Sequence, residues 1–321
     1  MTILVVGDAN ADINAAIERF PAEGDDSLVT ALAWSSGGSA ANVAAALGRL
    51  GLPVRLLARV GSDPAATVAL RAARAAGADL SAIQIDPLRA TGLCYAAVSP
   101  DGNRTFFSFR GANAAMAQPP AGLLAGLGWL HISAYALIEG TQRASCLALI
   151  DMARARALPI SLDLCMPALR AGRSEIVALL PQLAVLFGNE LELAELCPGL
   201  SQDGAAGQLL RQGVPLAVIK LGPRGCLVAE PAGLQHVPAF TVAALDTSGC
   251  GDAFVAGFLL ARLSGAPLAQ CATLANALGA LTATRPGAAD ALPTRDELRA
   301  LLLARPGATA AAALLSDHPA N

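Results

Sequence analysis

The chain has 321 residues, of which 54% are hydrophobic and 15% are charged, and its formal net charge is −3. This length and composition favour one large core-forming domain with an appendage over two equal domains. No basic patch argues for a nucleic-acid partner, and the apolar runs are too short to span a membrane. Seven cysteines without a C-x-x-C pair indicate reduced thiols, and no signal peptide precedes the first apolar run, so we expect a cytoplasmic protein.

Predicted strands and helices alternate along most of the chain. The first four are a strand at 3–8, a helix at 40–51, a strand at 54–60 and a helix at 64–76. Further strands are expected at 129–133, 159–165, 184–188, 216–221 and 226–229, and further helices at 141–157, 174–183, 190–196, 204–212, 250–264 and 267–284. This alternation predicts an α/β fold with a doubly wound, mostly parallel sheet flanked by helices.

Two segments depart from that pattern. Residues 10–36 and 91–111 are typical of β-ribbons, because alternating apolar residues flank turn residues such as Pro100 and Gly102. We therefore expect a small β-sheet from 10–36 and 91–111 beside a core formed by 1–9, 37–90 and 112–305. The alanine-rich tail, 306–321, is expected to be frayed or a loosely docked helix.

The stretch Asp246-Thr247-Ser248-Gly249-Cys250-Gly251-Asp252 is the most informative motif. The glycines allow a tight turn before an apolar helix, so the amides of Gly249, Cys250 and Gly251 can point at an anion near the helix N-terminus. A carboxylate beside an anion site suggests a general base, which makes Asp252 the catalytic candidate. The alternative is that the polar residues only cap the helix and the glycines only turn the chain.

A second glycine-rich stretch, Gly37-Gly38-Ser39-Ala40-Ala41-Asn42, precedes a helix of small residues. Its glycines permit close approach of a ligand, and Asn42 offers a donor and an acceptor to a hydroxyl group. Asn10 and Asp12 follow the first strand, at the sheet edge where α/β proteins bind ligands. Tight helix packing and an Asx-turn are the alternatives for these two segments.

Together these three segments resemble the signatures of the ribokinase family, also called the phosphofructokinase B (PfkB) family. The resemblance implies an ATP-dependent carbohydrate kinase, with the small sheet acting as a lid over the sugar. It implies that Asn10, Asp12, Gly37, Gly38 and Asn42 bind the acceptor. Arg110, at the end of the second ribbon, is expected either to reach a substrate oxygen or to pair on the lid surface.

The resemblance also implies residues for the nucleotide and for metal ions. Asn189 and Glu192 match the family's Asn-x-x-Glu motif, which holds Mg²⁺ largely through water; the alternative is a capping asparagine with a solvated glutamate. Lys220, Gly222, Gly225 and Asn276 are the remaining nucleotide-side candidates. Asp246 and Ser248 are candidates for a K⁺ site.

The acceptor is expected to be a sugar or a sugar-like molecule. Ribose is not favoured, because ribokinases usually carry Gly-Gly-Lys-Gly-Ala-Asn where this chain has Gly-Gly-Ser-Ala-Ala-Asn at 37–42. A nucleoside is the alternative, since Phe106, Phe107 and Phe109 could sandwich a base. A more distant alternative is that the protein is a catalytically silent relative that only binds a sugar.

Two other enzyme classes are disfavoured. Nicotinamide oxidoreductases carry Gly-x-Gly-x-x-Gly after the first strand, and this chain lacks it. It also lacks the P-loop motif of P-loop phosphotransferases.

Because the lid ribbon is too thin to bury its aromatic side chains alone, we also expect a homodimer through the lid.

Overall fold

The computed structural model describes residues 1–101 and 103–316. Its largest element is an eight-stranded sheet of order β14-β13-β12-β11-β10-β9-β1-β4, parallel from β12 to β4 and antiparallel at β13 and β14. The strands are β1 (Thr2–Val6), β4 (Val54–Leu57), β9 (Leu127–Ser133), β10 (Ile160–Asp163), β11 (Val185–Asn189), β12 (Ala217–Lys220), β13 (Cys226–Glu230) and β14 (Gly233–Val237). The predicted mostly parallel α/β fold is confirmed.

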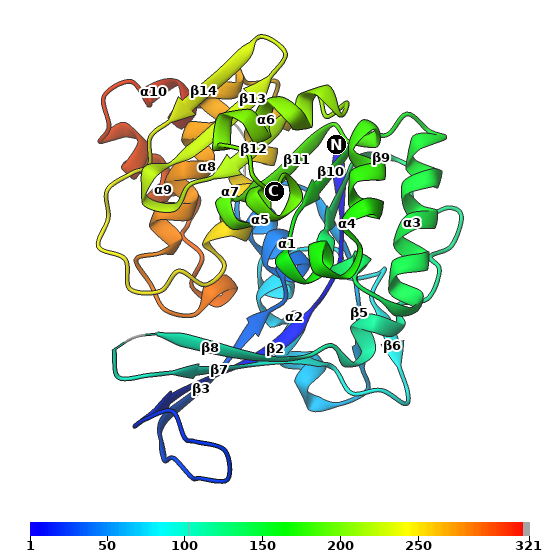
Figure 1. Cartoon of the computed structure of the whole chain (residues 1–321), viewed down its shortest axis with the longest axis vertical. Helices are drawn as coiled ribbons and strands as arrows, with labels where there is room; N and C mark the ends of the chain where they lie inside the picture. Colours follow the sequence, from blue (N-terminus) through cyan, green and yellow to red (C-terminus); the bar gives the residue numbers. More distant parts are fainter. Residues whose placement is uncertain (102, 317–321) are drawn as a thin grey trace.

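Helices cover both faces of this sheet (Figure 1). One layer contains α1 (Ser39–Arg49), α2 (Pro64–Ala75), α7 (Cys250–Leu263), α8 (Leu268–Thr282), α9 (Arg295–Leu303) and α10 (Thr309–Ala313). The other contains α3 (Gly140–Arg154), α4 (Met166–Leu179), α5 (Glu190–Leu196) and α6 (Gln202–Arg211). In β1, Ile3 and Val5 face the first layer while Leu4 and Val6 face the second, because successive strand side chains point to opposite faces. Burial on both faces explains the unbroken apolar run of β1.

A separate four-stranded sheet, here called the lid, extends away from the helices and the large sheet (Figure 1). It has the order β3-β2-β7-β8 and consists of β2 (Asn10–Ile17), β3 (Val29–Gly37), β7 (Gly92–Val98) and β8 (Arg104–Phe109). The strand pairing aligns Asp12 with Cys94 and Ser108 on one face, and Ile13 with Tyr95 and Phe107 on the other. We call these the inner and the outer face of the lid.

Several elements differ from the sequence-based expectation. Helix α4 begins at Met166, and non-helical dihedral angles at Gly172 divide it in two, so the helix predicted near 174–183 overlaps only its second part. The strand predicted at 54–60 is divided into β4 and the short strand β5 (Arg59–Gly61). The short strand β6 (Gln84–Asp86), the strand β14 and the helix α9 were not predicted.

Residues 309–316 of the tail pack against the rest of the protein, because Ala311, Ala312 and Leu315 are buried. These residues are therefore not frayed. The remaining tail residues, 317–321, lie outside the described part of the chain.

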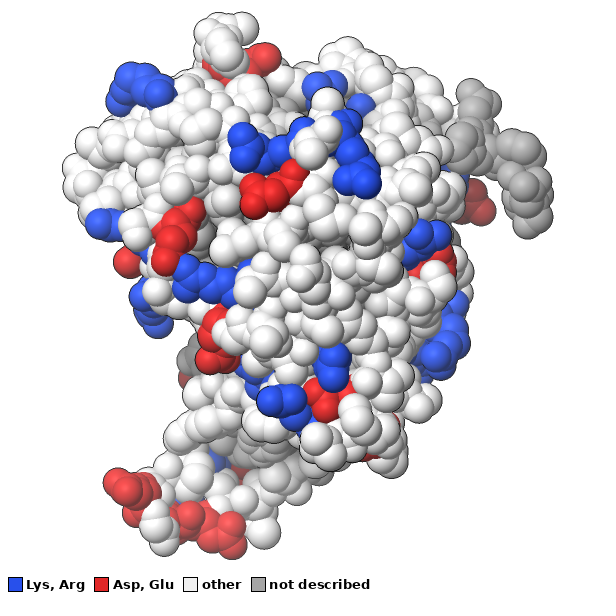
Figure 2. All heavy atoms as spheres, turned by 90° about the vertical axis from the view of Figure 1, so that its right-hand side faces the viewer, with Lys and Arg blue, Asp and Glu red and all other residues white. Residues whose placement is uncertain are grey.

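The molecular surface carries charges of both signs. On the face in Figure 2, basic and acidic side chains are interspersed, and acidic ones gather at the far end of the lid. Glu18, Glu23, Asp25 and Asp26 lie in the connection from β2 to β3. Among the described residues, no helix combines the length and the apolar character that crossing a membrane requires.

Candidate active site

The catalytic candidate Asp252 lies in the first turn of α7, after a left-handed residue. Gly249 has φ 71°, a conformation that glycine adopts at little cost, and it forms the N-cap of the helix. The amide of Cys250 donates to the Thr247 carbonyl at 3.3 Å, whereas those of Gly249 and Gly251 make no backbone hydrogen bond within the described chain. The anion-binding function predicted for three amides therefore fits Gly249 and Gly251 better than Cys250.

Two side chains of α1 fix the Asp252 carboxylate. Ser39 Oγ donates to Oδ1 at 2.7 Å and Asn42 Nδ2 donates to Oδ2 at 2.8 Å. Burial raises the pKa of Asp252 to about 6, although these two hydrogen bonds oppose the shift. The carboxylate is thus oriented and more basic than an exposed one. Ser39 was not predicted as a site residue, because nothing in the sequence pairs it with a residue 213 positions away.

Two glycines make room for the predicted acceptor-binding residues. A Cβ atom on Gly37 would lie 2.1 Å from Asp12 Oδ2, and one on Gly38, which has φ 87°, would lie 2.5 Å from the Asp8 carbonyl. Burial, and then the charges of Asp252 and Asp290, raise the pKa of Asp12 to about 7. The negative charge of the catalytic candidate Asp252 therefore acts on the Asp12 carboxyl group.

Arg110 is held at the base of the lid by buried polar groups. Its Nη2 donates to both Asp8 oxygens, at 3.0 and 3.2 Å, and to Gln142 Oε1. Asn113, which was not predicted as a site residue, donates from Nδ2 to Asn10 Oδ1 at 2.8 Å. Arg110 thus pairs inside the protein and not on the lid surface.

Four buried polar atoms in this region have no hydrogen-bond partner among the described residues: Asp12 Oδ1, Asn42 Oδ1, Arg110 Nε and Arg110 Nη1. Such atoms are costly to bury unless a ligand or water satisfies them. Two are acceptors and two are donors, which is the combination that hydroxyl groups require.

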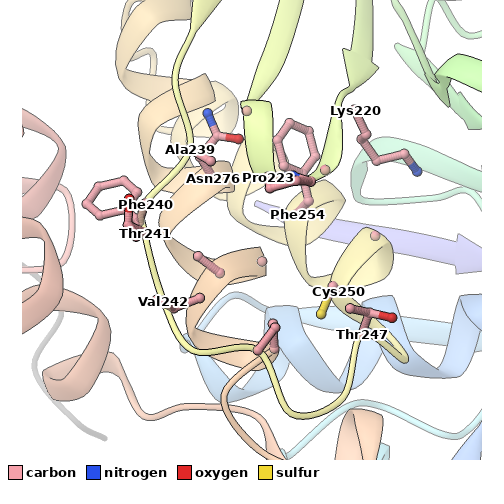
Figure 3. A pocket seen from close by; sticks show the side chains of 17 residues that line it. Lys220, Pro223, Ala239, Phe240, Thr241, Val242, Thr247, Cys250, Phe254 and Asn276 are labelled. Atoms are coloured by element: carbon pink, nitrogen blue, oxygen red, sulfur yellow. The ribbon is translucent and has the colours of Figure 1, made fainter. Parts of the chain in front are cut away.

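A cavity of about 480 Å³ opens beside the N-terminus of α7 (Figure 3). Its lining includes four of the five nucleotide-side candidates, namely Lys220, Gly222, Gly225 and Asn276, together with Cys250 and Gly251. Asn189, the fifth candidate, does not line it. Asn276 uses its Nδ2 to bind the Val237 carbonyl at 3.0 Å, so it holds the cavity wall.

Much of the cavity lining is apolar and includes Phe240, Val242 and Ala280. The guanidinium group of Arg305 lies 4.4 Å from the centroid of the Phe240 ring and donates to the Pro238 and Ala239 carbonyls. Arg305 therefore fixes this part of the lining from the C-terminal part of the chain.

Charged residues border the cavity at the carboxyl ends of β10, β11 and β12. Lys220 Nζ donates to Asp163 Oδ1 at 2.7 Å and lies 3.5 Å from the position of a Cβ on Gly251. Asn189 and Glu192 form a capping box at the start of α5, as the alternative interpretation of Asn189 expects. Glu192 is nevertheless buried rather than solvated, and burial raises its pKa to about 7.

The candidate K⁺ site does not fit the structure. Arg104, the first residue of β8, donates from Nη1 to Asp246 Oδ1 at 2.5 Å and to Ser248 Oγ. Asp246 also accepts from Ser248 N at 2.7 Å and from Gly287 N at 3.1 Å. A guanidinium group occupies the place in which Asp246 and Ser248 would bind a cation.

The inner and outer faces of the lid separate the three aromatic residues that were expected to sandwich a base. The pairing places Phe106 on the inner face and Phe107 and Phe109 on the outer face. The expectation that all three phenylalanines of one chain sandwich a base is therefore wrong.

Comparisons with known proteins agree with this geometry. A profile of the pfkB family carbohydrate kinases matches residues 2–295. The chain is 32% identical over 306 residues to the ATP-dependent ribose-1-phosphate kinase of Halopiger xanaduensis, covering 94% of this chain and 98% of that protein. It is 29% identical over 307 residues to fructokinase-1 of Oryza sativa subsp. japonica, covering 89% and 94%.

Solved structures show the same fold. Ribokinase from Thermotoga maritima superposes with a TM-score of 0.81 at 25% identity, covering 94% of this chain and 99% of that one. An E. coli protein described as ribokinase II, in complex with ATP and Mg²⁺, superposes with a TM-score of 0.83 at 22% identity, covering 95% and 99%. The chain belongs to the PfkB family of carbohydrate kinases and has the ribokinase-like fold, as its sequence motifs predicted.

Proposed function

We propose that this kinase transfers the γ-phosphoryl group of ATP to a hydroxyl group of a sugar, with Asp252 as the general base. The observation that carries the proposal is the Asp252 carboxylate itself, which Ser39 and Asn42 orient and whose pKa burial raises to about 6. A base with a pKa near the working pH is suited to accept a hydroxyl proton.

The reaction then proceeds by in-line displacement. The hydroxyl oxygen attacks the γ-phosphorus, its proton passes to Asp252, and ADP leaves with the electrons of the broken P–O bond. The free amides of Gly249 and Gly251, at the positive end of the α7 dipole, stabilise the charge on the transferring group. Lys220, which lies beside Gly251, adds positive charge there.

The cavity of 480 Å³ is the proposed ATP site, because its apolar lining suits adenine and the cavity also reaches Gly251. Glu192, a hard oxygen donor, and its neighbour Asp163 fit a water-mediated Mg²⁺ site, and the relative from E. coli binds both ATP and Mg²⁺. When bound, Mg²⁺ would neutralise phosphate charge.

The proposed acceptor is a sugar whose hydroxyl groups satisfy the unpartnered atoms of Asp12, Asn42 and Arg110. Asn10 lies next to them and is fixed by Asn113. A sugar phosphate is a second candidate, because Arg110 Nε and Nη1, which have no hydrogen-bond partner among the described residues, can also bind an anion. A curated relative is a ribose-1-phosphate kinase.

We further propose that two lids pack together in a homodimer. The outer face exposes Trp34, Phe107 and Phe109, each about half exposed. Phe20 stacks on Phe107 with 6.4 Å between ring centroids and extends this apolar surface. A two-fold contact would let the patch cover its own copy.

We place the enzyme in the cytoplasm, since its cysteines are free and five of the seven are buried.

Release of ADP from ATP in the presence of an acceptor panel tests the proposal. The panel contains free sugars, sugar 1-phosphates and nucleosides, with water as the blank. We expect turnover with a sugar or a sugar phosphate and a large loss of turnover in Asp252→Asn. ATP binding without turnover on any acceptor would instead indicate a catalytically silent relative.

A further inference from the structure

Arg104 links the lid to the turn that precedes the catalytic helix. It begins β8 and contacts Asp246 and Ser248, 142 and 144 residues later in the chain. Only about a fifth of its side chain is exposed, and Asp246 is almost fully buried. The contact is therefore an inward-facing ion pair and not a surface one.

Both carboxylate oxygens of Asp246 already accept hydrogen bonds from described residues, one of them from the Arg104 guanidinium group. Oδ1 accepts from Arg104 and Ser248 N, and Oδ2 accepts from Gly287 N. Although burial opposes it, the hydrogen bonds from Arg104 and from those two backbone amides lower the pKa of Asp246. Asp246 is thus ionised and already neutralised. A second cation here would meet the guanidinium charge and would have to displace it.

We propose that Arg104 is a positioning residue that replaces a monovalent cation beside the anion-binding turn, so that the enzyme needs no K⁺. Ser248, which Arg104 contacts, directly precedes Gly249, whose amide faces the transferring phosphoryl group in the proposed function. The guanidinium group therefore holds the turn in the conformation that an ion would otherwise impose.

Thermal unfolding without substrates tests the inference independently of the proposed function. The midpoint is measured for wild type, Arg104→Ala and Arg104→Lys in K⁺ and in tetramethylammonium at equal ionic strength. We expect K⁺ to raise the midpoint of Arg104→Ala selectively, by roughly 2 °C at a concentration well above its Kd, because binding to the vacated site stabilises the fold. Wild type and Arg104→Lys should show no difference between the two salts.

Turnover on the acceptor found with the panel gives the second measurement. Wild-type turnover should differ by less than about twofold between the salts, whereas Arg104→Ala should lose about tenfold or more and recover part of it in K⁺. K⁺-dependent stabilisation or activation of wild type would overturn the inference even if Arg104→Ala did not fold. Unchanged turnover of a folded Arg104→Ala would also overturn it. If no acceptor is phosphorylated, the proposed function fails while the unfolding data still decide the inference.

Discussion

Replacing Asp252 by Asn should stabilise the protein in a pH-dependent manner. Burial raises the pKa of this carboxyl from 3.8 to about 6, and each unit corresponds to about 1.4 kcal/mol, so ionisation costs the folded state about 3 kcal/mol. As the pH rises from about 4 to about 6, the unfolded chain loses this proton first, and the free energy of unfolding falls. Asn does not ionise. The free energy of unfolding of Asp252→Asn should therefore exceed that of wild type by up to about 3 kcal/mol at pH 8 and equal it near pH 4.

Urea unfolding at both pH values, followed by tryptophan fluorescence, measures this difference. Asp246→Asn is the control, because, although burial opposes it, hydrogen bonds from Arg104 and two backbone amides lower the pKa of that carboxyl. It should destabilise the protein at pH 8, since a carboxyl whose pKa is lowered in the folded state stabilises that state when it is ionised. The same Asp252→Asn protein should lose about two to four orders of magnitude in turnover while binding ATP normally. A destabilised Asp252→Asn at pH 8, or an equal gain at both pH values, would refute the reasoning.

Three further outcomes are expected. Asp12→Ala should weaken sugar binding far more than ATP binding in calorimetry, because it removes an acceptor of sugar hydroxyl groups; equal effects would make Asp12 structural. Ser39→Ala removes a hydrogen bond that lowers the pKa of Asp252, so the acid limb of the kcat profile should move to higher pH, and an unmoved limb would contradict this. Phe107→Asp should convert the proposed dimer to a monomer in light scattering, whereas a monomeric wild type would exclude the lid dimer.

The fold was predictable because its signals are local. The apolar run of β1 and the motifs at 37–42 and 246–252 each lie within a few consecutive residues. The kink at Gly172 was missed because its dihedral angles depend on the packed structure and not on a nearby pattern. A strand as short as β6 contains too few residues for a period to be recognised.

The site was predictable in its backbone and much less so in its side-chain pairing. Asp252 stands in the helix turn where the motif expects it, but its contacts with Ser39 and Asn42 join residues more than 200 positions apart. The contact of Arg104 with Asp246, at the position of the predicted cation site, is equally remote. Such pairs depend on how the lid and the sheet are placed in space, which periodicity and spacing do not encode.

The position of Arg305 has a consequence for synthesis on the ribosome. The proposed acceptor residues belong to the first 110 positions, whereas the wall around Phe240 is held by the guanidinium group of Arg305, much later in the chain. Because chains emerge from their N-terminus, the acceptor-binding segments are complete long before the ATP cavity can close. A nascent chain would therefore meet cellular ATP before it has a finished site for it.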